Sequence, residues 1–319
     1  MPSSGARTDG EGGPRGGLQE QFWVKASDGE RVEAMRLYFA GNVKPSANDD
    51  AHAVCYADGV RSRLQTFADI DDWAREGFRY WVEDAPPRDV SVFLDSGAFG
   101  AFMRGAKLDL GRYCDYIAEH KQALDCYAAL DVIGDWEGTK ANTDAMVARG
   151  LRPIPTYHRG SPWHALDRIA AEFPYIAIGG LAADTSRPGQ RPSFSQANIQ
   201  PFMDEVFLRL ERHWPVKVHA FGMISQWALE RYPLYSADSA TAIVGAGMGR
   251  VSRFRRGLLQ SSPWFPDDLE RTWDGAVADG VGRAGGSAHA GRRRRNIEAV
   301  LALEQEMTDL WTAKGVAWS

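Results

Sequence analysis

The chain has 319 residues, of which 44% are hydrophobic and 25% charged, values that are ordinary for a globular protein in water. This length supports one large α/β domain with extra segments, or two smaller domains. No run approaches the roughly 18 apolar residues that a membrane span needs, so we expect no membrane association. The formal net charge of −5 does not by itself favour a nucleic-acid-binding protein.

The three cysteines, Cys55, Cys114 and Cys126, are scattered and show no Cys-x-x-Cys spacing. Such thiols are typical of a reducing compartment and argue against a zinc site made of thiolates. The N-terminus also lacks a basic segment followed by an apolar stretch, which is the pattern of a secretory signal. We therefore expect a cytoplasmic protein with no bound metal.

The first part of the chain contains one predicted strand and one predicted helix. Residues 1–20 are rich in Gly, Ser, Pro and charge and lack apolar periodicity, which predicts a disordered tail. Residues 36–41 form a short apolar run ended by Gly-Asn and predict a strand. Aromatic residues at helical spacing predict an amphipathic helix over residues 70–83.

From residue 91 onward, short apolar runs alternate with longer amphipathic stretches, a pattern that predicts βαβ units and a parallel sheet. Together with residues 36–41 the runs give seven strands, and residues 243–251 are the candidate for an eighth. This number predicts a closed (β/α)8 TIM barrel of the α/β class. The predicted strands cover residues 92–94, 127–133, 152–157, 175–178, 216–220 and 234–237, and the predicted helices cover residues 110–121, 139–149, 162–172, 199–213 and 225–231.

Two segments fall outside this alternation. The polar residues 182–200 follow a strand, so we expect a lid or a substrate-contacting loop on the active face of the barrel. Residues 257–291 are irregular, and residues 296–314 predict a C-terminal helix that packs on the barrel. The predicted organisation is a tail over 1–20, a barrel over 21–256 and a C-terminal extension over 257–319.

Polar residues follow most of the predicted strands, and a barrel brings the carboxyl ends of all its strands to one rim. Burying so many ionisable groups there without a function would be costly. Each one also has a plain structural interpretation: a turn at Asp95, a helix cap at Asp238, and hydrogen-bonded core histidines at His158 and His219. The strand-end residues are Asp95, Asp131, Asp135, His158, Gly179, Gly180, His219, Gly222 and Asp238.

Three kinds of chemistry fit these residues, and the residues alone leave all three open. A metal-dependent hydrolase would use His158, His219 and a carboxylate, although no closely spaced ligand pair supports such a site. Ordinary glycoside hydrolysis needs two carboxylates across a sugar–oxygen bond. Base exchange at a sugar–nitrogen bond needs a carboxylate nucleophile and a second carboxylate that handles the proton.

Two clusters of arginine stand out against the negative net charge. They can bind phosphates, or they can lie on solvated faces of the protein without a ligand. The first cluster consists of Arg250, Arg253, Arg255 and Arg256, and the second of Arg292, Arg293, Arg294 and Arg295.

Four motifs resemble those of the tRNA-guanine transglycosylases, in the family's order and over residues 35–255. Residues 95–99 (Asp-Ser-Gly-Ala-Phe) resemble the Asp-Ser-Gly-Gly-Phe signature, and residues 175–181 resemble the glycine-rich base-binding strand. Residues 219–223 resemble the strand end with His and Gly, and residues 235–239 the strand with the nucleophilic aspartate. Residues 130–135 (Leu-Asp-Val-Ile-Gly-Asp) and 153–158 add a closer resemblance to relatives from phages and bacterial DNA-modification clusters, which place 7-deazaguanine bases into DNA.

The resemblance implies a role for each matching residue. Asp238 would be the nucleophile and Asp95 the general acid and base, while Asp131 would recognise the guanine-like base edge. Phe99 and Met223 would sandwich the base, and Gly179 and Gly180 would let backbone amides approach it. Further substrate-binding positions implied by the motifs are Ser96, His158 and His219.

One departure from the family concerns the substrate. The tRNA enzymes carry a Cys-rich zinc subdomain that helps to hold RNA, and this chain has no cysteine after Cys126. We therefore expect DNA as the partner, with the two arginine clusters on its phosphates, a base such as 7-cyano-7-deazaguanine as the small substrate, and no cofactor. The alternatives are a tRNA-guanine transglycosylase and a barrel hydrolase of glycosides or nucleosides. A non-catalytic relative is disfavoured because both key acids are present, and a partner protein is not predictable.

Overall fold

The fold is described from a computed structural model, which covers residues 34–40, 55–68, 89–181, 195–263, 286–316 and 318. The predicted tail over 1–20 and the predicted helix over 70–83 lie outside the described residues. The same holds for most of the predicted loop over 182–200, of which the described part begins at Ser195.

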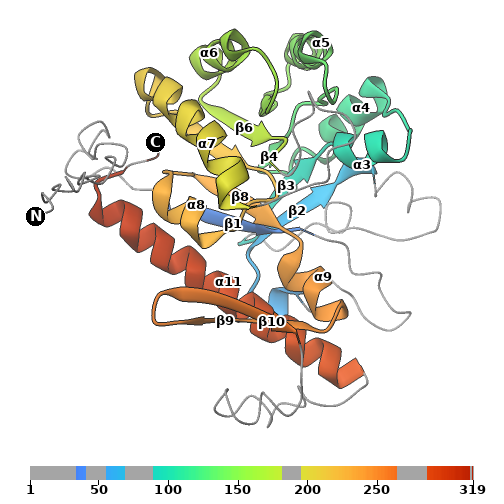
Figure 1. The fold of residues 1–319 in the computed structure, drawn as a ribbon. Coiled ribbons are helices and arrows are strands. Elements are labelled where there is room, and N and C mark those ends of the chain that lie inside the picture. Colours follow the sequence, from blue (N-terminus) through green and yellow to red (C-terminus); the bar gives the residue numbers. More distant parts are fainter. Residues whose placement is uncertain are drawn as a thin grey trace, which may run out of the picture.

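Eight parallel strands form one curled sheet. This sheet lies at the centre of the described part of the chain (Figure 1). Their order is β4-β3-β2-β1-β8-β7-β6-β5, so β4 and β5 are the two ends of the sheet. A parallel bridge between Ala128 and Ile154 joins these two ends and closes the ring. The predicted α/β barrel is therefore confirmed. The strands are β1 (Arg36–Phe39), β2 (Ser62–Thr66), β3 (Ser91–Asp95), β4 (Cys126–Tyr127), β5 (Thr156–His158), β6 (Tyr175–Gly179), β7 (Lys217–Ala220) and β8 (Ser236–Ser239).

Helices follow the strands and surround the sheet (Figure 1). Beyond the barrel, the chain forms an antiparallel hairpin of β9 (Arg250–Arg255) and β10 (Leu258–Pro263) and ends in the long helix α11 (Gly286–Ala313). The hairpin turn consists of Arg256 and Gly257, so the predicted boundary at residue 256 falls inside this turn. The remaining helices are α3 (Ala98–Met103), α4 (Leu110–His120), α5 (Trp136–Ala148), α6 (Trp163–Glu172), α7 (Gln196–Leu210), the short η1 (Glu211–His213), α8 (Gln226–Arg231) and α9 (Thr241–Gly247).

The prediction of an eighth strand over residues 243–251 is wrong. Ile243 lies in helix α9, and β9 pairs with β10 outside the barrel. The missing barrel strand is β2, whose sequence Ser-Arg-Leu-Gln-Thr has a single apolar residue, Leu64. Arg63 and Gln65 in this strand are nevertheless buried, so its polar sequence hides its place in the sheet.

The predicted strand over 127–133 is also much shorter in the structure. Strand β4 covers only Cys126–Tyr127, and Ala128 adds the single bridge to Ile154. After this bridge the chain leaves the sheet, because the next apolar residues, Ala129 and Leu130, pack against helices α4 and α5 in a separate cluster.

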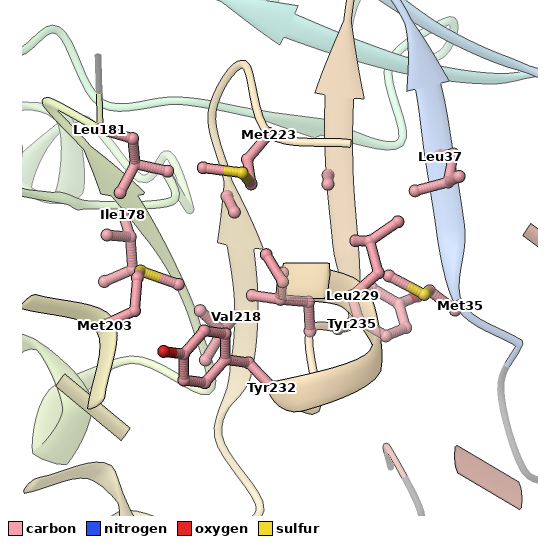
Figure 2. Packing of buried hydrophobic residues seen from close by; sticks show 14 of the residues in the cluster. Met35, Leu37, Ile178, Leu181, Met203, Val218, Met223, Leu229, Tyr232 and Tyr235 are labelled. Atoms are coloured by element: carbon pink, nitrogen blue, oxygen red, sulfur yellow. The ribbon is translucent and has the colours of Figure 1, made fainter. Parts of the chain in front are cut away.

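Two apolar layers lie on the two faces of the curled sheet. The interior of the ring is filled by a small cluster that includes Tyr38, Phe93 and Ala177. A larger cluster lies between the outer face of the sheet and the helices, and Figure 2 shows Ile178, Leu181 and other members of it. Side chains of a strand alternate between the two faces, so strands such as β1 and β6 contribute apolar residues to both layers.

Helix α11 contains the predicted C-terminal helix and begins ten residues earlier than residue 296. It lies beside the hairpin β9–β10 and crosses one side of the barrel (Figure 1). Trp311 donates a hydrogen bond from Nε1 to the backbone oxygen of Leu229, at 2.8 Å. Asn296 is fully buried and joins the backbones of α9 and β9, with bonds to Ala242 O and from Ser252 N.

One acid of α11 is bound to the first strand of the barrel. Glu304 accepts a hydrogen bond from the backbone nitrogen of Leu37 at 2.5 Å. Burial raises the pKa of the Glu304 carboxyl from 4.5 to about 7, even though the bond from Leu37 and the charge of Arg36 lower it. The helix therefore places against β1 an acid that stays protonated to a higher pH than an exposed Glu.

This acid predicts a pH dependence of stability. Between pH 4.5 and about 7 the folded state holds a proton that the unfolded state has lost, so stability falls as pH rises through this window. In Glu304→Gln a neutral amide oxygen still accepts from Leu37. We expect this variant to gain stability relative to the wild type by up to about 3 kcal/mol between pH 5 and pH 8.

Urea unfolding at several pH values measures this difference. Glu298→Gln, which changes an exposed acid of the same helix, is the matched control. A Glu304→Gln difference that stays constant from pH 5 to pH 8 would contradict the assignment.

Candidate active site

The strand-end acids face the interior of the barrel. Asp95 lies two residues after Phe93, and Asp238 lies two residues after the fully buried Ser236. Because side chains alternate along a strand, these acids share the inner face with the interior cluster. His158 lies an even number of residues after Ile154, another interior residue, so its side chain also points to the inner face. The predicted convergence of ionisable groups at one end of the ring thus agrees with the alternation of the strands.

Asp131 is the centre of a hydrogen-bonded group contributed by three successive β–α units. Its Oδ2 accepts from His158 Nε2 at 2.6 Å, and its Oδ1 accepts from Ser96 Oγ at 3.1 Å. The Ser96 hydroxyl in turn accepts from the backbone nitrogen of Ala98 at 3.2 Å. Both carboxylate oxygens of Asp131 therefore have a donor, which fixes the orientation of this acid while each oxygen can accept once more.

Gly179 is required by the position of the His158 ring. A Cβ atom at residue 179 would lie 2.8 Å from His158 Cε1 and 2.9 Å from Nδ1. Side chains do not tolerate such distances, so a glycine here lets the imidazole lie against β6 and reach Asp131. Among the described residues, His158 Nδ1 has no hydrogen-bond partner although it is buried. Gly180, the next residue, has a φ of 70°, a conformation that favours glycine.

Asp95 ends β3 and begins a tight turn. One of its carboxylate oxygens, Oδ2, accepts from the backbone nitrogen of Gly97 at 3.1 Å, so the turn interpretation of Asp95 is confirmed. Gly97 has a φ of 78°, and a Cβ there would lie 2.6 Å from both Ala68 Cβ and Thr66 Cγ2. The turn holds Asp95 half-buried at the strand end, a position compatible with a chemical role as well.

Asp238 is held by only one of its two oxygens. Its Oδ1 accepts from the backbone nitrogen of Gly222 at 2.7 Å and lies 3.3 Å from His219 Nε2. Among the described residues, Oδ2 has no hydrogen-bond donor. The predicted alternative, a cap on the following helix, is wrong because Ser239 Oγ, rather than Asp238, accepts from Thr241 N at the start of α9.

His219 is fully buried, one residue layer deeper in the barrel than Asp238. It pairs with Ser236 in the sheet, and its Nδ1 is 2.6 Å from Ser236 Oγ. The rings of Phe93 and Phe221 lie edge-on to the imidazole, with centroids 4.7 and 4.6 Å away. The structure therefore places His219 next to Asp238, in the interior rather than at the open rim.

The two residues proposed to sandwich a base have opposite environments. Phe99 is 51% exposed on helix α3, directly after the Asp95 turn. Met223 is 1% exposed and packs in the outer apolar cluster, where Figure 2 shows it near Leu181. The ring of Phe99 is therefore accessible to solvent, whereas Met223 in this structure contributes to packing.

The two arginine clusters also differ. In the hairpin, Arg250, Arg255 and Arg256 are exposed and Arg253 is partly buried. The four-arginine run lies on α11, and Arg293 is buried and pairs with Asp58 at 3.2 Å. The other members of the run also have partners: Arg292 donates to the backbone oxygen of Ala246 in α9, and Arg294 and Arg295 pair with Glu298 in the same helix.

Several residues near the site were not identified from the sequence. Tyr175 and Ser236 complete the hydrogen bonds behind His219, and Phe221 packs on its ring. The signal for Ser236 was its position two residues before Asp238 on a strand, which gives both side chains the same face. Asp135, in contrast, caps α5 by accepting from Gly138 N and has a structural role there.

No three donors meet as a metal ion would require among the residues that the structure describes. His158 and His219 each lie against a different carboxylate.

Over the same part of the chain, no helix is both long and apolar enough to cross a membrane. Neither the protein-family models nor the curated proteins contain a match to this chain.

The contact between residue 179 and His158 predicts the effect of a single added methyl group. Gly179→Ala should displace the imidazole from Asp131 and destabilise the protein by about 1–3 kcal/mol. In Gly179→Ala/His158→Ala most of the crowding is removed, so the double variant should lose less than the sum of the two single losses. Denaturant unfolding of all four proteins measures this coupling.

Gly245→Ala is the control, because a Cβ there would lie at an ordinary van der Waals distance of 3.7 Å from its nearest side-chain neighbour, Arg250 Cβ. Additive losses at residues 158 and 179 would show that the glycine serves another purpose.

Proposed function

We propose that this protein is a base-exchange transglycosylase that replaces guanine in DNA with a 7-deazaguanine, through a covalent bond between Asp238 and the nucleotide. The observation that carries the proposal is that Asp238 is held through only one of its two carboxylate oxygens. This acid faces the barrel interior, is fixed through Oδ1 and keeps Oδ2 for a substrate. A second acid, Asp95, ends a strand of the same ring, as a two-carboxylate exchange requires.

The first half of the reaction transfers the nucleotide to the enzyme. The target nucleotide leaves the duplex, because its C1′ is not accessible to a carboxylate while the base is stacked. Asp238 Oδ2 attacks C1′, the bond from C1′ to the base nitrogen breaks, and the base keeps the bonding electrons. Asp95 in its acid form donates a proton to the guanine, which leaves as a neutral base.

The second half reverses these steps with a different base. The incoming 7-deazaguanine gives a proton to Asp95, and its ring nitrogen attacks C1′. The bond to Asp238 breaks and the carboxylate is restored, so the enzyme ends in its starting state. Both halves use groups of this chain and the two bases alone.

Recognition of the base is assigned to Asp131. A guanine-like edge presents N–H donors, and each oxygen of Asp131 has a lone pair left after its bond to His158 or Ser96. The fixed carboxylate can therefore accept two parallel bonds from the base. The His158 ring occupies the space at Gly179, so the approach of backbone amides to the base is assigned to the half-buried Gly180, and the exposed ring of Phe99 is available for stacking.

The nucleophile is tested by Asp238→Asn. With duplex DNA and labelled 7-cyano-7-deazaguanine, incorporation should fall by at least about a thousandfold, while DNA binding in a gel-shift assay persists. Asp135→Asn is the matched control, since Asn also caps a helix and residue 135 lies outside the ring. Full incorporation by Asp238→Asn would refute the proposal, and incorporation into tRNA alone would reassign the substrate.

The hairpin supplies a second test, on the nucleic-acid partner. Arg256 has a φ of 52° in a two-residue turn with Gly257, a conformation that favours Asn or Gly. An exposed arginine at such a position costs stability, which is consistent with selection for its charge. We therefore assign phosphate binding first to the hairpin tip.

Arg256→Asn should act in opposite directions on stability and on binding. The turn becomes more favourable, so the midpoint of urea unfolding should stay the same or rise. DNA affinity should fall, and the slope of log affinity against log salt should decrease by about one. Lys121→Ala, which removes an exposed charge after α4, is the control. An unchanged salt slope for Arg256→Asn would exclude the hairpin tip from the interface.

A further inference from the structure

Behind Asp238 lies a buried chain of hydrogen bonds with no part in the exchange chemistry above. Ser236 Oγ is 2.6 Å from His219 Nδ1 and also 2.6 Å from the hydroxyl of Tyr175. The three groups come from three neighbouring strands, β8, β7 and β6. Ser236 and His219 are both 0% exposed. Because no water competes in such surroundings, each group of the chain needs a hydrogen-bond partner within it, and this requirement decides which group donates each bond.

The direction follows from the number of hydrogen atoms. Burial raises the pKa of the Tyr175 hydroxyl well above its ordinary value of 10, so this group keeps its proton. Ser236 is its only hydrogen-bond partner among the described residues, so Tyr175 donates and Ser236 accepts. The single hydrogen of Ser236 is then directed to His219 Nδ1. A nitrogen that accepts carries no proton, which places the proton of the neutral imidazole on Nε2.

His219 Nε2 faces the nucleophile. It lies 3.3 Å from Asp238 Oδ1, but the direction is not that of a hydrogen bond, and within the described residues this buried nitrogen has no other partner. Such contacts are often long in the free enzyme and tighten when substrate binds. The rings of Phe93 and Phe221 against the imidazole prevent it from turning away.

We propose that Tyr175 and Ser236 are positioning residues, which hold His219 as the tautomer with its proton on Nε2 so that it orients Asp238 through Oδ1 and leaves Oδ2 for attack on C1′. The role given to Asp238 rests on the proposed function. The tautomer of His219 does not, because it follows from the hydrogen bonds alone.

Nitrogen NMR of protein labelled at its histidine rings tests the tautomer directly. Spectra of wild type and His219→Gln identify the signals of His219 among those of the seven histidines. In the wild type we expect a protonated Nε2 and an unprotonated Nδ1. Ser236→Ala and Tyr175→Phe should each lose this single state and give a mixture with the Nδ1-protonated form. Where Ser236→Ala does not fold, Tyr175→Phe decides alone.

Tyr38→Phe is the matched control. Its hydroxyl is buried in the same interior and its ring centroid is 6.2 Å from that of His219, but its hydrogen-bond partners are Ser91 and Cys126. This variant should keep the wild-type tautomer. Protonation of Nδ1 in the wild type, or a single Nε2-protonated state in every variant that folds, would overturn the proposal.

Base exchange supplies the second measurement. If Ser236 only supports the fold, its loss should alter stability and leave the kinetics of the folded enzyme unchanged. As a positioning residue, its replacement by Ala should lower kcat by up to about 100-fold with KM unchanged. An equal kcat in folded Ser236→Ala would remove the positioning role. Absence of exchange in the wild type would count against the proposed function, while the NMR result would still decide the tautomer.

Discussion

A single parallel bridge decides which side chains can meet in this barrel. Strands β4 and β5 are the open ends of the sheet, and they are joined by Ala128 and Ile154, with hydrogen bonds from Ala129 N to Ile154 O and from Ile154 N to Tyr127 O. Asp131 and His158 follow this junction, three and four residues later. Without the bridge the ring would be open between them, and the hydrogen bond of 2.6 Å that fixes Asp131 would have no frame to support it.

The inner acids of the ring are bound in contrasting ways, and the contrast supports different roles. Asp131 has a donor on each oxygen, so it is a rigid acceptor suited to recognising a base edge. Asp238 is fixed on one side only, by a backbone amide and the edge of an imidazole. An acid fixed on both oxygens cannot easily form a new covalent bond, whereas one fixed through a single oxygen is oriented and still reactive.

The barrel could be predicted from the sequence because seven of its strands contain a short apolar run, and these runs alternate regularly with amphipathic helices. Strand β2 could not be predicted, since Arg63 and Gln65 are buried there by contacts that no local pattern reveals. At the site, the acids were identifiable from their positions after strands. The relation of Gly179 to the His158 ring depends on strands pairing across the sheet, and such pairing is not visible in one sequence.

The way the ring closes has a consequence for synthesis on the ribosome. Strand β1 pairs with β8, and the paired residues Arg36 and Ser236 lie 200 positions apart in the chain. At a synthesis rate of about 5–20 residues per second, roughly 10–40 s pass between the synthesis of β1 and that of its neighbour β8. The backbone nitrogen of Leu37 waits longer still, until Glu304 of the last helix has been made. The native contacts of β1 are therefore completed only after residue 304 has been synthesised, so this strand spends most of the synthesis of the domain without its final neighbours.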